Sequence, residues 1–139
     1  MNDYSLKDIY SGMQESFSVK ITPELEDSFR ELTGDRNPLH YDDEFAQKYL
    51  RGGGHAVFGM LSAAFLSTLA GMYLPGKYSL IHSVENLSFL KPVHSGDVLN
   101  VKGVVTDIYE ELRMIKVGVT MSRPDEVVLK AKMKILVLQ

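Results

Sequence analysis

The chain has 139 residues, mixed charges that sum to −3 and no cysteine. These features exclude a disulfide framework, a thiolate nucleophile and a cysteine metal site. No run of Lys or Arg indicates a nucleic-acid surface, and residues 1–20 lack the apolar core of a signal peptide. The length is that of one domain, so we expect residues 1–139 to form a single cytoplasmic domain.

The first part of the chain predicts a short strand and two helices. Residues Phe17–Ile21 alternate between polar and apolar, as a strand does. The pair Thr22-Pro23 is typical of a helix N-terminus, and Gly34 is suited to cap the end of that helix. A second, shorter helix is expected over residues 42–50. The run Gly52-Gly53-Gly54 breaks it.

Residues Ala56–Gly76 contain no charged side chain. About 20 such residues could span a bilayer, but small polar and glycine positions dilute the apolar character of the segment. A helix that is apolar all round can instead be buried inside a globular protein. We therefore expect a buried helix from about Phe58 to Tyr73, which the rest of the chain must surround.

After this segment the apolar period changes to that of strands. Four strands are expected, at Ile81–Leu90, Val98–Tyr109, Arg113–Met121 and Glu126–Leu138. Short connections between them favour an antiparallel sheet, hence an α+β fold in which a twisted sheet curls around the apolar helix. A sheet covers only part of a helix, so the short helices or a second copy of the chain must cover the remainder. We expect a homodimer.

The stretch Thr33–Asp42 contains the residues most suited to chemistry. A loop here holds the carboxylate of Asp35 and the imidazole of His40, with Pro38 between them. Histidine titrates near neutral pH, and a carboxylate can orient it or share a water with it. Spacing alone favours a structural reading, because Asp, Asn and Pro are ordinary loop residues.

The same stretch resembles the signature of the MaoC-like, (R)-specific enoyl-CoA hydratases: Thr-Gly-Asp, then Asn-Pro-x-His, then Asp. The resemblance implies the hot dog fold, a curved antiparallel sheet around one long helix, in a dimer. Supporting similarities follow in the same order along the chain, at Asp8-Ile9 with Gly12, Gly59-Met60-Leu61 with Ser62, Phe89–Val93, and Gly96-Asp97.

The resemblance also implies a role for each residue. Asp35 and His40 would activate a water that adds to a trans-2-enoyl thioester, or dehydrate an (R)-3-hydroxyacyl thioester. The amide of Gly59 and the side chain of Ser62 would bind the substrate. The resemblance also places Asn37 among the substrate-binding residues, although we expect its main role to be shaping the loop. No cofactor or metal is expected, since the substrate arrives on coenzyme A or acyl carrier protein and no histidines have metal-ligand spacing.

The chain departs from the family pattern where Phe58 takes a position at which a His is common. His55 occurs three residues earlier, after the triple glycine, and we expect it to be structural. His82 and His94 are expected to be solvated or paired within the protein. Because of this departure, the sequence does not specify which acyl group the pocket accepts.

Two other functions fit the sequence. A hot dog thioesterase needs a carboxylate near the central helix, and Ala56–Gly76 has none. A non-catalytic acyl-thioester-binding subunit would not need Asp35 and His40, which are both present. Hydration or dehydration is therefore the favoured reading.

Overall fold

The computed structural model describes all 139 residues. Its centre is one antiparallel sheet of five strands in the order β1-β3-β4-β5-β2. The strands β3, β4 and β5 follow one another through short turns, whereas β2 pairs with β5 and β1 pairs with β3. The bounds are β1 Gln14–Lys20, β2 Ser79–Phe89, β3 Val98–Tyr109, β4 Met114–Arg123 and β5 Glu126–Val137.

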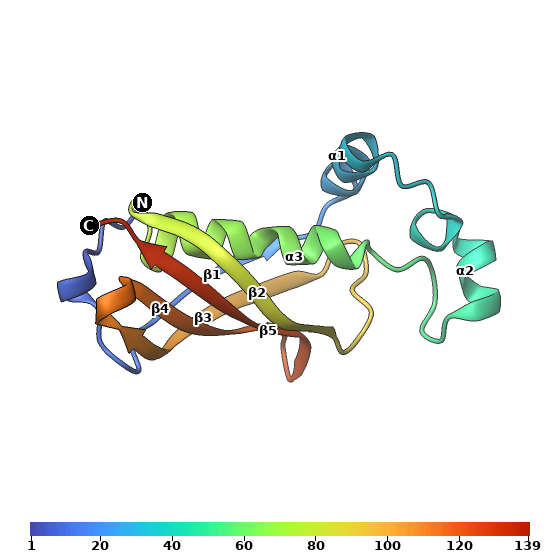
Figure 1. Cartoon of the computed structure of the whole chain (residues 1–139). Helices are drawn as coiled ribbons and strands as arrows, with labels where there is room; N and C mark the ends of the chain where they lie inside the picture. Colours follow the sequence, from blue (N-terminus) through green and yellow to red (C-terminus); the bar gives the residue numbers. More distant parts are fainter.

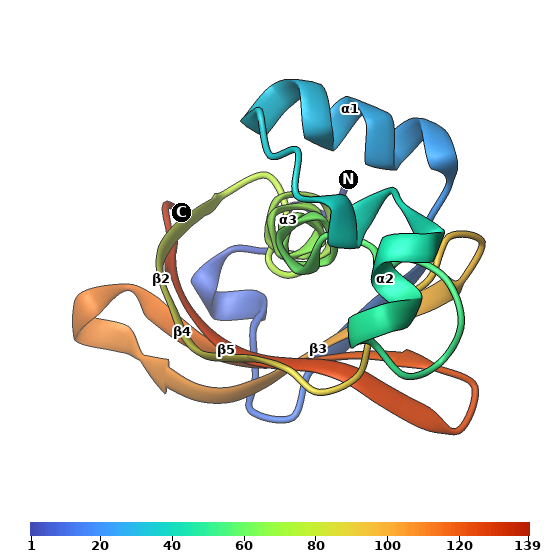
Figure 2. The ribbon, with the colours of Figure 1, turned by 90° about the vertical axis from the view of Figure 1, so that its right-hand side faces the viewer.

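The charge-free segment forms the central helix. It runs as α3, Gly59–Thr68, and continues as a π-helical turn over Leu69–Tyr73. Figures 1 and 2 show α3 crossing the concave face of the sheet, which curls around it. The helix is too short to cross a membrane. The prediction of a buried helix inside a curved antiparallel sheet is therefore confirmed for the face of α3 that meets the sheet.

The opposite face of α3 is uncovered. Met60, Ala64 and Ser67, which fall on one side of the helix, are exposed, and the side chain of Met60 is 58% accessible. The neighbouring edge strand β2 has no partner on its outer side and exposes Leu80 and Val84. One chain thus leaves part of its apolar centre open to solvent.

The strands bury the faces that their alternation predicts. Inward residues of β3 and β4, such as Val101 and Val117, are fully buried, while the lysines of β5 point outward. The alternation of apolar residues in β5 predicts Val127 on the buried face, but Val127 is partly exposed and Val128 is buried instead. The register between β4 and β5 shifts between Met121 and Ser122, and such an irregularity turns the next residue to the other face.

Two helices overhang one end of α3 (Figure 1). They are α1, Pro23–Thr33, and α2, Asp43–Tyr49. The predicted caps are present: Thr22 Oγ1 accepts a hydrogen bond from Leu25 N–H at 3.3 Å, and Gly34 adopts a left-handed conformation with φ 72°. These caps fix where the chain leaves α1, and so where the Asp35–His40 loop begins.

Candidate active site

The loop between α1 and α2 is shaped by its own polar side chains. Asp35 Oδ1 accepts a hydrogen bond from Asn37 N–H at 3.0 Å, and Asn37 Oδ1 accepts one from Leu39 N–H at 3.1 Å. Asn37 thereby caps the short 3-10 turn Pro38–His40. The structure gives Asn37 the loop-shaping role expected of it, while contact with a substrate stays a prediction.

His40 is held in one orientation by its surroundings. Its Nδ1 lies 2.8 Å from the carbonyl oxygen of Ala56. A carbonyl oxygen only accepts hydrogen bonds, so Nδ1 carries the proton and a neutral ring has its lone pair at Nε2. The half-buried ring is therefore prepared to accept a proton at Nε2. No direct hydrogen bond joins His40 to Asp35, whose side chain is exposed.

Phe58, where the chain departs from the family pattern, lies beneath His40. Its ring is 2% exposed and packs between the rings of His40, at 4.3 Å between centroids, and Phe29, at 5.0 Å. Phe58 lines neither of the two cavities described below. The ring of Phe58, at a position where the family commonly has His, thus supports the ring of His40.

The N-terminus of α3 presents unpaired donors. Gly59 and Met60 lie in the first turn, and their N–H groups donate to no group of the protein. A Cβ at Gly59 would come within 3.0–3.3 Å of the Phe89 ring. The glycine is therefore needed for packing against Phe89, and its amide stays available to an acceptor.

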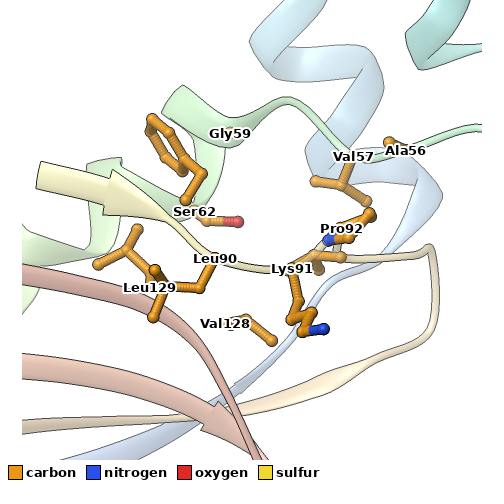
Figure 3. A pocket seen from close by; sticks show the side chains of 11 residues that line it. Ala56, Val57, Gly59, Ser62, Leu90, Lys91, Pro92, Val128 and Leu129 are labelled. Atoms are coloured by element: carbon orange, nitrogen blue, oxygen red, sulfur yellow. The ribbon is translucent and has the colours of Figure 1, made fainter. Parts of the chain in front are cut away.

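Ser62 directs its hydroxyl into a cavity. The side chain is buried, makes no hydrogen bond back to its own helix, and lines a hollow of about 260 Å³ between α3 and the end of β2. Figure 3 shows the hydroxyl facing the space bounded by Val57, Leu90 and Pro92. Gly59 and Ala56 line the same cavity.

A second, larger hollow of about 640 Å³ contains Asp35. Apart from Asp35, its walls are almost wholly apolar and come from the end of α1, the uncovered face of α3, and β2. They comprise Phe29, Thr33, Met60, Ala63, Ala64, Leu66, Ser67, Ile81, Val84 and Leu87. The two cavities share no lining residue. A single chain thus brings Gly59, Ser62 and Ala56 together around the smaller cavity and places Asp35 in the larger one. His40 lines neither cavity and is linked to the smaller one through its hydrogen bond to Ala56.

The remaining histidines are held within the protein or face solvent. His55 bridges Asp43 and Glu26, at 2.7 and 3.0 Å, and this confirms a structural contact. His94 contacts the carbonyl oxygen of His55 through Nδ1 at 3.0 Å. His82 is exposed on β2. The contact between His55 and Glu26 could not be read from spacing, because the two residues are 29 positions apart.

A curved antiparallel sheet around a central helix, with a polar loop overhanging the helix N-terminus, defines the class as hot dog proteins. Residues 9–127 match the sequence model described as MaoC like domain. The chain therefore belongs to the MaoC-like dehydratase family.

Its curated relatives are hydratases and dehydratases. It is 33% identical to a 3-hydroxybutyryl-CoA dehydratase of Methylorubrum extorquens, over 88% of this chain and 77% of the relative. It is 30% identical to an (R)-specific enoyl-CoA hydratase of Rhodospirillum rubrum, over 94% of this chain and 90% of the relative.

Solved structures agree in fold. The (R)-hydratase of Aeromonas caviae involved in PHA biosynthesis superposes with a TM-score of 0.87 at 26% identity, covering 94% of this chain and 98% of that one. The unliganded R-hydratase PhaJ1 of Pseudomonas aeruginosa superposes with a TM-score of 0.89 at 22% identity, covering 99% and 87%.

Proposed function

We propose that the protein catalyses (R)-specific hydration of trans-2-enoyl thioesters, or the reverse dehydration of (R)-3-hydroxyacyl thioesters. Asp35 and His40 form its acid–base pair. The observation that carries this proposal is the 2.8 Å contact from His40 Nδ1 to the Ala56 carbonyl. It leaves Nε2 as a base, and the acceptor residue Ala56 lines the cavity that holds the Ser62 hydroxyl and the unpaired amide of Gly59.

The chemistry divides between the two ends of the substrate double bond. His40 Nε2 takes a proton from a water held with Asp35, and the hydroxyl adds to C3 of the enoyl group. Negative charge moves to the thioester oxygen, where the Gly59 N–H and the positive end of the helix dipole stabilise it. The pair then delivers a proton to C2, so that one water is added across the double bond.

The two cavities suggest how the substrate is arranged. The apolar hollow beside Asp35 suits an acyl chain, and the smaller cavity beside Ser62 suits the thioester arm. Lys91 is the only charged residue of the smaller cavity and could meet a phosphate of the carrier, whether coenzyme A or acyl carrier protein. The substrate supplies this carrier itself, so the reaction needs no cofactor and no metal.

We further propose that the working form is a homodimer. The open face of α3 and the unpaired edge of β2 are apolar and adjacent, and Met60 and Val84 line one hollow between them. A second copy related by a two-fold axis would cover both, because an isologous contact pairs the same surface on each chain. It would also enclose the hollow that contains Asp35.

Two alternatives have less support. A hot dog thioesterase would use a carboxylate near the central helix, and neither α3 nor its π-helical continuation carries one. A non-catalytic binding subunit would have no need for a histidine oriented with a free Nε2.

Incubation with crotonyl-CoA separates the three functions. Loss of the conjugated double bond without release of free thiol indicates hydration, and thiol release indicates a thioesterase. The absence of both changes indicates a binding subunit or an enzyme whose substrate has a different acyl group. Chiral analysis of the product reports the (R) configuration. We expect Asp35→Asn and His40→Ala each to lower hydration by about 10²–10⁴-fold, the usual range for general acid–base catalysis. Full activity in both variants would refute the assignment of the pair.

A further inference from the structure

The ring of His55 lies between two carboxylates from different helices. Its Nδ1 is 2.7 Å from Asp43 Oδ1 on α2, and its Nε2 is 3.0 Å from Glu26 Oε1 on α1. Ionised carboxylates only accept hydrogen bonds, so both ring nitrogens must donate. The geometry is therefore that of an imidazolium cation between two anions.

Glu26 depends on this contact. It is 3% exposed and is the only buried residue of α1. Leu25 and Phe29 of α1 pack against the core as their helical spacing predicts. Leu32 of the same stripe is 83% exposed, whereas Glu26 turns inward to His55. A buried carboxylate without a partner is costly, and His55 is the only side chain bonded to it. The position of α1 is thus tied to the charge of His55.

The triple glycine allows His55 to reach Asp43. Gly52, Gly53 and Gly54 all have positive φ, at 119°, 75° and 88°. Residues other than glycine rarely adopt these backbone conformations. A Cβ at Gly54 would also come within 3.3 Å of Asp43 Oδ1. The turn directs the backbone N–H of His55 at the same oxygen, at 2.8 Å. The three glycines and His55 therefore form one turn that binds Asp43.

This turn leads directly to Ala56, whose carbonyl oxygen is the hydrogen-bond partner of His40. Ala56 follows His55; its carbonyl accepts from His40 Nδ1, and its N–H donates to the carbonyl oxygen of Leu39 at 3.1 Å. The backbone of Ala56 is thus bonded to the catalytic loop on both sides, and the anchor immediately before it is His55.

We propose that Glu26, His55 and Asp43 form a positioning unit that fixes the carbonyl of Ala56 and so holds the ring of His40 in its active orientation. Because the unit requires a charged His55, the orientation of His40 is lost when His55 gives up its proton. This inference rests on the proposed function only in taking His40 as the base. His55 is a positioning residue and touches no substrate.

The surroundings of His55 favour its charged form. Burial lowers the pKa of His55, but the hydrogen bonds to Asp43 and Glu26, with the charges of both, more than offset it, so the pKa is raised. Other titratable groups around the ring are Asp27 and Arg30 of α1, which pair with each other at 2.9 Å, together with Tyr41 and His94. With a raised pKa, His55 stays charged to a higher pH than a free histidine does. While Glu26 and Asp43 are ionised the unit is complete, and it is lost as the pH rises through the pKa of His55.

The test compares three variants with the parent protein. His55→Gln removes the cation, and Glu26→Gln removes one charge but keeps an acceptor for Nε2–H. Asp27→Asn is the matched control, since Asp27 lies next to Glu26 on α1, is 71% exposed and pairs only with Arg30. For each variant, kcat and KM with crotonyl-CoA are measured against pH, and ¹⁵N NMR of labelled histidine reports which nitrogen of His40 carries the proton.

We expect His55→Gln to lower kcat by about 10- to 100-fold, as displaced catalytic groups do, with little change in KM. Its His40 signal should change from the Nδ1–H form to a mixture of tautomers. Glu26→Gln should move the alkaline limb of the kcat profile to lower pH, because one carboxylate fewer lowers the pKa of His55. Asp27→Asn should change neither measurement.

Unchanged kcat profiles and an unchanged His40 tautomer in both Glu26→Gln and His55→Gln would overturn the proposal, even if stability fell. If His55→Gln does not fold, the Glu26→Gln profile and tautomer decide alone. Failure of the proposed function is recognised separately: His40→Ala would then keep hydration, while the NMR signal of His40 in the parent chain would still report whether His55 orients it.

Discussion

The Nδ1 atom of His40 lies 2.8 Å from the carbonyl oxygen of Ala56, while the His40 ring packs on the ring of Phe58. A hydrogen bond sets the direction of the ring and an aromatic contact sets its plane. Together they replace a direct bond to Asp35, which the structure does not have. The lone pair of Nε2 is thereby prepared before substrate binds.

The contact with Phe58 predicts that Phe58→Leu damages activity more than stability. A core substitution of this kind should lower the free energy of unfolding by about 1 kcal/mol, and the freed ring of His40 should lower kcat by about tenfold. Urea denaturation and crotonyl-CoA kinetics measure the two effects. Phe17→Leu is the control, since Phe17 loses a comparable stacking contact with Tyr73 at 4.8 Å, away from the loop. Equal kcat values for both variants would contradict the role of Phe58.

A methyl group at position 59 should impair catalysis without unfolding the protein. Alanine favours a helix over glycine by up to about 1 kcal/mol, but its Cβ would meet the Phe89 ring at 3.0 Å and push it aside. We expect Gly59→Ala to keep its melting temperature and to lose about tenfold in kcat/KM, because the approach to the amide narrows.

The double variant with Phe89→Leu should recover part of that loss, since the shorter side chain makes room. Gly71→Ala provides the control, because a Cβ there meets no atom within 4 Å. A Gly59→Ala protein as active as the parent would show that the amide is not approached from this side.

The acid stability of the fold should depend on Asp43. Hydrogen bonds from the ring and backbone N–H of His55 lower the pKa of its carboxyl. A lowered pKa contributes stability above the unfolded value, near 3.9, that is lost as pH falls through the folded value. Asp43→Asn should therefore flatten the fall in melting temperature below about pH 4. Asp125→Asn changes an exposed turn residue with no ion pair. In this variant the melting temperature should fall with pH as steeply as in the parent protein.

Much of this fold could be predicted from the sequence because its signals are local. Period-two alternation identified the buried faces of β3 and β4, and Thr22 and Gly34 gave the bounds of α1. The burial of Glu26 on α1 could not be predicted, since its partner His55 lies far along the chain.

Part of the candidate site could likewise be predicted from the sequence, and part could not. The Asp35–His40 motif could be recognised from its residues, and the hydroxyl of Ser62 was a reasonable candidate because its helix begins at Gly59. The acceptor for His40 is a backbone carbonyl 16 residues away, which no residue type reveals. The position of Phe58 beneath the ring also depends on tertiary packing, so the sequence showed only that it differs from the family pattern.

The uncovered face of α3 predicts how the dimer can be broken. Ala64 is exposed on that face and lines the hollow that contains Asp35. Ala64→Glu would place a charge where a second copy is expected to pack, and desolvating it without a partner is unfavourable. We expect light scattering to change from about twice the 15.6 kDa chain mass to one chain mass, with circular dichroism unchanged. Leu112→Glu, which alters another exposed apolar residue outside this face, should leave the dimer intact. If Ala64→Glu keeps the parent's mass, the partner chain does not cover α3.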